Sequence, residues 1–228
     1  MTGPAARLPR ISGPDDLAAA FDLTAQTRQR LEVYAGVLTR WQRAVNLVAP
    51  NTLPEIWHRH FADSLQLARL IPNREGALAD LGSGAGFPGL VLAAHFHDQG
   101  GPRVILVESD QRKAAFLREA ARAMEISVEI LSTRIESDAN LARLSCVDFV
   151  TARALAPLPR LFSLVCPFLS PAAVCIFLKG RSVAREIEEA RETWSFALEE
   201  HPSLTEDEAS ILMVRAIRPR SGTGQQTE

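Results

Sequence analysis

The sequence predicts an α/β fold in which a mostly parallel sheet follows an N-terminal helical extension. Two observations support this prediction. Short apolar segments alternate with segments of helical periodicity from residue 77 almost to the C-terminus. The first of them breaks into a glycine-rich turn that opens directly into an apolar helix, within residues 77–96. Such alternation indicates parallel strands joined by right-handed crossovers, with ligands bound at the carboxyl ends of the strands.

Length and composition limit the architecture. A chain of 228 residues accommodates one α/β domain with an added helical segment, but not two domains of ordinary size. No apolar run approaches the ~20 residues that a bilayer span requires, so we expect no membrane-spanning helix. The cysteines, Cys146, Cys166 and Cys175, are odd in number and show no C-x-x-C spacing. This pattern argues against disulfides and zinc, and we expect no metal and a reducing, cytoplasmic location.

The N-terminal third is predicted to be helical after a flexible leader. Residues 1–23 contain no apolar signal core and are expected to be flexible. Over residues 24–47 an apolar residue recurs every three or four positions, as on one face of an amphipathic helix. A second helix is predicted over residues 53–71, where Pro54 suits the first turn. We place this helical segment at residues 24–72.

Residues 73–219 are predicted to form the sheet domain, before a disordered end at residues 220–228. Strand-helix units or strand fragments are expected at residues 77–96, 103–125, 128–137, 148–155 and 174–180. A long helix over residues 181–200 and an apolar strand over residues 210–219 complete the domain.

The glycine-rich turn indicates an adenosine cofactor. Gly82, Gly84 and Gly86 permit dihedral angles and a close approach that a Cβ atom forbids, and the next helix offers unpaired N–H groups beside them. The spacing G-x-G-x-G is tighter than the dinucleotide pattern G-x-G-x-x-G, and Asp80 precedes the first glycine. An acid there suits a cationic sulfonium better than a pyrophosphate, which favours S-adenosylmethionine over NAD. The alternative for Asp80 is an Asx turn that stabilises the loop itself.

A second acid follows at the end of the next strand. Glu108 is placed to accept both ribose hydroxyls, because such a carboxylate normally lies about 20 residues past the glycines, slightly less than the span here. This spacing is compatible with either cofactor. The alternative for Glu108 is a solvated acid at the end of a strand.

Seven segments of the chain form a specific set. They read WQRAVNLV (41–48), RHFADSL (59–65), DLGSGAGFPG (80–89), ESDQRKAAFLRE (108–119), TRIE (133–136), TARAL (151–155) and FLKG (177–180). Through them the chain resembles, over about residues 28–215, the RsmG family of bacterial 16S ribosomal RNA guanine-N7 methyltransferases. The leader has no counterpart in the core of that family.

The resemblance implies a Rossmann-like class I methyltransferase fold with a seven-stranded sheet. It also implies methyl transfer from S-adenosylmethionine to N7 of one guanine in the decoding-region loop of 16S rRNA, with the small ribosomal subunit as partner. By the same resemblance, the positions that hold the cofactor are Gly82, Phe87, Ile135, Glu136 and Arg153.

The residues suit this chemistry. Guanine N7 carries a lone pair and no proton, so its attack on a sulfonium methyl needs no general base. The fourth strand reads TARAL, without the N/D-P-P-Y/F pattern that holds an exocyclic amine. Arg153 is the candidate for orientation, because its guanidinium fork suits guanine or a cofactor carboxylate. The alternative is an ion pair with Glu136 or Asp63.

A ribosomal target also requires contacts with phosphates. The net charge of −2 argues against a surface that is basic all over, so we expect the contacts with RNA phosphates to be local. The candidates are Arg59, His60, Arg112, Lys113 and Lys179. For Arg112 and Lys113 the alternative is a solvated first turn of a helix.

Two other functions remain open. An NAD-dependent oxidoreductase would use the same loop and Glu108, but no catalytic pair for hydride transfer is recognisable. A ribosome-assembly factor would bind RNA and keep the cofactor pocket as a relic. The presence of Asp80, Glu108 and Arg153 argues against this second alternative.

Overall fold

The computed structural model describes residues 7–72, 75–97 and 99–220. Within them one sheet has the strand order β3-β2-β1-β4-β5-β7-β6. The strands from β1 to β5 pair in parallel, whereas β7 is antiparallel to both β5 and β6. Their bounds are β1 (Ala77–Leu81), β2 (Arg103–Val107), β3 (Glu129–Leu131), β4 (Phe149–Arg153), β5 (Val174–Lys179), β6 (Trp194–Pro202) and β7 (Ser210–Pro219). The predicted α/β class and the mostly parallel sheet are confirmed.

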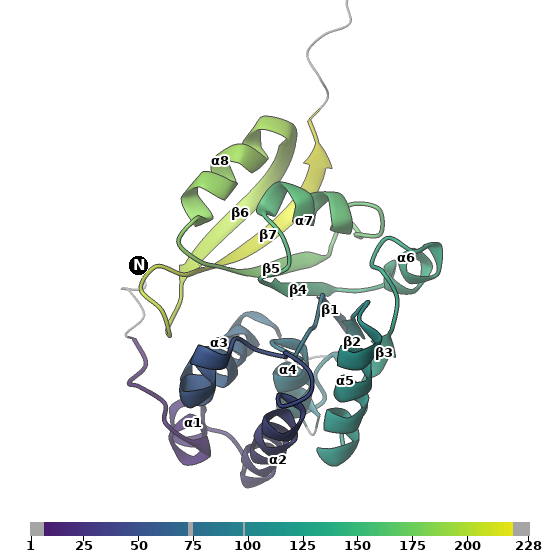
Figure 1. Ribbon diagram of the computed structural model, residues 1–228. Coiled ribbons are helices and arrows are strands. Elements are labelled where there is room, and N and C mark those ends of the chain that lie inside the picture. The colour runs from purple at the N-terminus through teal and green to yellow at the C-terminus, as the bar shows by residue number, and fades with distance from the viewer. Residues whose placement is uncertain (1–6, 73–74, 98, 221–228) are drawn as a thin grey trace, which may run out of the picture.

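Helices cover both faces of the sheet (Figure 1). One face carries α1 (Pro14–Phe21), α2 (Ala25–Trp41), α3 (Asp63–Leu65), α4 (Gly89–Phe96) and α5 (Gln111–Ala123). The other carries α6 (Asp138–Leu144), α7 (Leu158–Val165) and α8 (Val183–Thr193). Each layer buries its own apolar cluster against the sheet. The carboxyl ends of β1, β2 and β4 therefore meet at one edge, where the glycine loop lies.

The leader is more ordered than the sequence predicts. Ile11 and Leu17 are 2% and 1% exposed, and both belong to the core cluster of the first face. Pro14 and the acids that follow it begin α1, because proline fits a first helical turn and acids complement the helix dipole there. The expectation of a flexible leader is wrong for residues 7–23, and residues 1–6 lie outside the described ranges.

The predicted second helix is helical but not a single α-helix. A 3₁₀ segment η1 (Pro50–Glu55) leads into a π segment η2 (Trp57–Ala62), then α3, then a second 3₁₀ segment η3 (Gln66–Leu70). The preceding helix α2 ends at Trp41 rather than at residue 47. Its C-terminal neighbour Gln42 uses its side-chain amide to bond the backbone of Leu47 and Val48, which holds that segment as a turn.

The predicted long helix over residues 181–200 is also wrong in its second half. Helix α8 ends at Thr193, and Trp194 begins the edge strand β6. Trp194, Phe196 and Leu198 alternate along that strand and pack on the apolar cluster of the second face. An alternation with a period of two residues is the pattern of a half-buried strand. At the C-terminus Arg220 is described, whereas residues 221–228 of the predicted disordered end are not.

Candidate functional site

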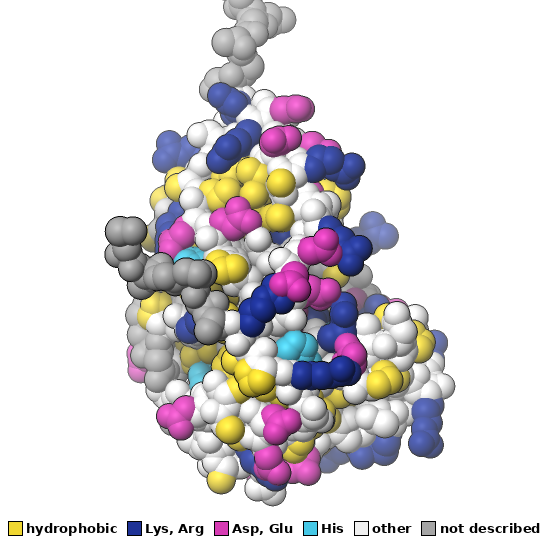
Figure 2. All heavy atoms as spheres, turned by 90° about the vertical axis from the view of Figure 1, so that its left-hand side faces the viewer, with side chains coloured by type: hydrophobic (Ala, Val, Ile, Leu, Met, Phe, Trp, Pro, Cys, Tyr) yellow, Lys and Arg dark blue, Asp and Glu magenta, His cyan; other side chains and the backbone are white. Residues whose placement is uncertain are grey.

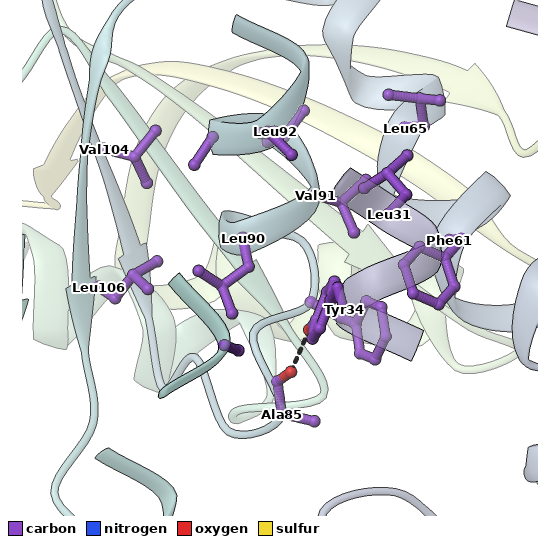
Figure 3. Close-up of a cluster of buried hydrophobic side chains, with 14 of the residues drawn as sticks. Leu31, Tyr34, Phe61, Leu65, Ala85, Leu90, Val91, Leu92, Val104 and Leu106 are labelled. Atoms are coloured by element: carbon purple, nitrogen blue, oxygen red, sulfur yellow. Dashed lines mark hydrogen bonds between the residues drawn. The ribbon is translucent and has the colours of Figure 1, made fainter. Parts of the chain in front are cut away.

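The glycine loop is held from two sides. Gly82 has a φ of +63°, and a Cβ atom there would lie 2.6 Å from Leu155 Cδ1. Gly86 has a φ of +87°, and its Cβ would lie 2.7 Å from the hydroxyl of Tyr34. That buried hydroxyl reaches from α2 and donates a hydrogen bond to the carbonyl of Ala85 (Figure 3). The loop is thus clamped between α2 and the segment after β4, and side chains are excluded at both glycines.

Glu108 joins the loop to the second strand. Its carboxylate accepts the backbone N–H of Gly84 and the backbone N–H of Asp110, each at 2.8 Å. The residue is 7% exposed. Because a carboxylate has about four acceptor positions, one on each oxygen stays available for a further donor.

A hollow of about 560 Å³ opens in front of these groups, and we name it the loop hollow. Its volume lies in the range of small-molecule sites. The predicted cofactor residues that line it are Gly82, Gly84, Glu108, Ile135 and Glu136, together with the phosphate candidate Lys113. The five cofactor residues follow the ends of β1, β2 and β3, as the topology predicts, and Lys113 lies in the first turn of α5. Glu136 also pairs with Arg160 across 2.8 Å.

The other four cofactor candidates do not line the loop hollow. Asp80 lies beneath it and is fully buried. Its carboxylate accepts the backbone N–H of Gly89 at 3.2 Å and the hydroxyl of Thr151 at 2.9 Å, and burial raises its pKa to about 6. Asp80 therefore ties β1 to β4 and to the start of α4. Gly86 lies on the side of the loop that faces Tyr34.

Phe87 is likewise part of the core. It is 3% exposed, and its ring lies 5.3 Å from that of Tyr34, 5.0 Å from that of His60 and 5.2 Å from that of Phe61. The guanidinium of Arg153 lies 5.1 Å from the centre of the Phe87 ring. The ring of Phe87 thus packs against the guanidinium of Arg153.

Arg153, at the end of β4, is held by several partners. Its guanidinium donates to the carboxylate of Asp63 at 3.3 Å, to the carbonyl of Arg59 at 3.2 Å and to Nδ1 of His60 at 2.8 Å. The ion pair with Asp63 is the alternative that the sequence left open for Arg153. Burial and the neighbouring arginines lower the pKa of His60 to about 3, so its ring is neutral. Nδ1 accepts from Arg153, and Nε2 carries the hydrogen and donates to the hydroxyl of Thr52 at 2.8 Å.

A second hollow, of about 520 Å³, lies beside Arg153, and we name it the side hollow. Its lining includes Asp63, Arg153, Lys179, Glu186 and Glu206. Residues 154–156 line both hollows. A short segment after β4 is therefore the common wall of the two cavities, and Arg153 stands at the start of that wall.

Two of the five phosphate candidates already have partners within the protein. Lys179 is 8% exposed at its side chain and pairs with Glu186 across 2.7 Å, and His60 is a neutral ring within the Arg153 network. Neither presents a free cation. A sequence shows the residue but not its partner, and Glu186 gave no signal in the sequence.

The other three candidates are on the surface or in a hollow. Arg59 is 42% exposed at its side chain and pairs with Glu206, Arg112 donates to the carbonyl of Ala44, and Lys113 lines the loop hollow. On the face drawn in Figure 2, basic and acidic side chains are interspersed, in keeping with the small net charge. Among the described residues no helix is long and apolar enough to cross a membrane, and no group of three or more His, Cys, Asp or Glu side chains is arranged to hold a metal.

The fold is that of S-adenosylmethionine-dependent methyltransferases. It is similar to an O-methyltransferase from Bacillus cereus in complex with SAH, with a TM-score of 0.54 and 15% identity over 80% of this chain and 90% of that one. It is equally similar, at a TM-score of 0.54 and 12% identity, to a SAM-dependent methyltransferase from Aquifex aeolicus, over 80% of this chain and 98% of that one. At these identities the similarity establishes the fold alone.

The sequence comparisons establish the family. A model of the family described as rRNA small subunit methyltransferase G matches residues 27–213. A relative named ribosomal RNA small subunit methyltransferase G in Rhodospirillum centenum is 46% identical over 205 residues, which cover 90% of this chain and 91% of the relative. A relative of the same name in Parvibaculum lavamentivorans is 41% identical over 214 residues, or 94% of each chain. The chain therefore belongs to the rRNA small subunit methyltransferase G family.

Proposed function

We propose that this protein transfers a methyl group from S-adenosylmethionine to N7 of one guanine in the decoding-region loop of 16S rRNA. The observation that carries the proposal is the pair of hollows at the carboxyl ends of the strands, which share residues 154–156 as one wall. Two adjoining cavities suit a donor and an acceptor that must meet. The family directs the proposal to the RNA of the small ribosomal subunit. Such a reaction places the protein in the cytoplasm with its ribosomal substrate.

The loop hollow suits the cofactor. S-adenosylmethionine, when bound, supplies an electrophilic methyl group on a cationic sulfur. Each oxygen of Glu108 keeps an acceptor position for a ribose hydroxyl, beside the N–H groups that already orient it. Ile135 and Leu155 offer apolar contacts to a purine, and Glu136 adds negative charge. The space before Gly82 and Gly84 allows a ligand to approach the backbone closely.

The side hollow suits the acceptor base. Arg153 starts the shared wall, with its orientation fixed by Asp63, His60 and Phe87. The carboxylate of Asp63, which pairs with Arg153, already accepts from Arg153, Thr205 and Gln66 and is not free to act as a general base. Attack by guanine N7 needs none. Catalysis then rests on alignment, which is worth on the order of 7 to 11 kcal/mol of barrier in well-oriented systems. Arg153 orients the reactants, and Arg59, Arg112 and Lys113 contact RNA phosphates.

The first test measures the binding of S-adenosylmethionine and of NAD by calorimetry. We expect binding of S-adenosylmethionine alone, weakened at least about 10-fold in Glu108→Gln, which replaces one acceptor oxygen by a donor. Glu129→Gln is the matched control, because Glu129 begins β3, forms a surface pair with Arg143 and lines neither hollow. Preferential binding of NAD would favour the oxidoreductase.

A turnover assay completes the test. Wild-type protein, methyl-labelled S-adenosylmethionine and small subunits lacking the modification should give labelled 16S rRNA. Cofactor binding without any transfer to subunits, free RNA or assembly intermediates would instead support a cofactor-retaining assembly factor.

A further inference from the structure

The wall between the two hollows is a short and constrained segment. Ala154 has a φ of +52°, in the left-handed region that most side chains avoid. The side chain of Leu155 lies 2.6 Å from the position that a Cβ on Gly82 would occupy. Residues 154–156 line both cavities. A displacement of this wall therefore changes the loop hollow and the side hollow together.

Lys179 and Glu186 hold the end of this wall. The ammonium of Lys179, at the end of β5, donates to the carbonyl of Ala156 and to Oε2 of Glu186, each at 2.7 Å. The same Oε2 accepts the backbone N–H of Leu158 at 2.9 Å. The two backbone groups that are bound lie on either side of Pro157, which has no N–H of its own.

The contact with Leu158 also serves the start of α7. The residue before this helix is Pro157, and its side chain makes no capping hydrogen bond. Glu186 supplies the missing acceptor from α8, and its negative charge complements the N-terminal end of the α7 dipole. Its other oxygen accepts the hydroxyl of Ser182 at 2.6 Å. Each charged group is thus satisfied by its partner and by the backbone that it holds.

The pair is nearly buried, which fixes its geometry. The side chains of Lys179 and Glu186 are 8% and 11% exposed. A partly buried charge that loses its partner is strongly unfavourable, so the two groups act as a unit. The carboxylate and the carbonyl take two of the three N–H donors of the ammonium, and the charge of Glu186 already balances its own.

We propose that Lys179 and Glu186 are positioning residues for methyl transfer, which fix the wall between the cofactor and the acceptor base. This inference rests on the proposed function and assigns a task to the FLKG segment other than RNA binding. A misplacement of about 1 Å costs on the order of 100-fold in rate when catalysis depends on alignment. The effect of losing the pair therefore falls on kcat rather than on the affinity for RNA.

The test compares Lys179→Met with the wild-type protein in steady-state methyl transfer to unmodified small subunits. We expect kcat to fall by 10-fold to 100-fold and KM for the subunit to change less than about threefold. The salt dependence of subunit binding, measured by filter retention between low and moderate salt, should keep its slope. A side chain that contacts a phosphate would instead lower that slope by about 1 when it is removed.

Two further variants separate positioning from stability. Glu186→Gln keeps the size and one acceptor oxygen but loses the charge that holds Lys179, and it should lower kcat by about 10-fold; it decides the question if Lys179→Met does not fold. Leu17→Ala lowers thermal stability in α1, away from both hollows, and should leave kcat unchanged at a temperature where every variant is folded.

The outcomes distinguish this inference from the proposed function. A wild-type protein that transfers no methyl group refutes the proposed function. An active wild-type protein whose Lys179→Met and Glu186→Gln variants keep kcat within twofold refutes the positioning role alone. A lower salt slope with a raised KM would also overturn it, and would return Lys179 to the RNA contacts.

Discussion

Asp80 gives the prediction whose magnitude follows most directly from the structure. Its carboxyl group is buried beneath the glycine loop, and burial raises its pKa from 3.8 to about 6. Because the pKa of Asp80 is higher in the folded state, its contribution to stability is fully present below pH 3.8 and is lost as the pH rises through 6. A shift of this size corresponds to about 3 kcal/mol.

The variant Asp80→Asn removes the titration but keeps the shape. The amide oxygen still accepts the N–H of Gly89, and the hydroxyl of Thr151 turns to accept from the amide NH₂. The unfolding free energy of the variant, relative to the wild-type protein, should therefore increase by up to about 3 kcal/mol between pH 4 and pH 7. At pH 7 the variant should be at least as stable as the wild-type protein.

The assay is urea denaturation at several pH values between 4 and 7.5, for both proteins. The difference in unfolding free energy between the two proteins isolates the effect of Asp80 from that of His60. The pKa of His60 is lowered to about 3, so its contribution to stability has the opposite pH dependence: it is present above pH 6.5 and is lost as the pH falls. A difference that does not vary with pH would refute the account of Asp80. A large loss of S-adenosylmethionine affinity without any change in stability would show instead that Asp80 contacts the cofactor.

The remaining predictions concern the loop and the shared wall. Gly82→Ala should weaken S-adenosylmethionine binding by at least about 10-fold in calorimetry, because its Cβ would lie 2.6 Å from Leu155 at a φ of +63°. The control Gly36→Ala, on the exposed face of α2, should bind S-adenosylmethionine normally and gain about 0.5 to 1 kcal/mol of stability. Tyr34→Phe leaves the carbonyl of Ala85 unsatisfied and should cost about 1 to 3 kcal/mol in denaturation; unchanged stability would show that the hydroxyl does not hold the loop. Arg153→Ala should abolish methyl transfer with the fold retained by circular dichroism, and a fully active variant would remove its role in orientation.

Local chemistry made the cofactor half of the site predictable. Gly82, Gly84 and Glu108 lie together because glycine spacing and an acid at the next strand end follow from a βαβ unit, and the parallel topology brings these ends to one edge. The pattern of apolar residues likewise predicted β1, β2, β4, β5 and β7 near their observed positions.

Other features of the structure depend on side-chain partners that the sequence does not reveal. No residue next to Lys179 in the sequence indicates that it pairs with Glu186. The neutral state of His60 depends on Arg153, which lies 93 residues away in the sequence. The order in residues 7–23 comes from Ile11 and Leu17, which pack into the apolar cluster of the first face, and local sequence does not show this contact. Trp194, Phe196 and Leu198 did carry an alternating signal for β6, which the strongly polar helix pattern before them obscured.

The position of the methyl group in the product shows which atom of the RNA the protein methylates. Small subunits lacking the modification are incubated with the protein and S-adenosylmethionine, and their 16S rRNA is tested for N7-methylguanine by reduction and strand cleavage at the methylated base. We expect one new cleavage, at a guanine of the decoding-region loop. Methyl transfer to another atom, another base or several scattered guanines would contradict it.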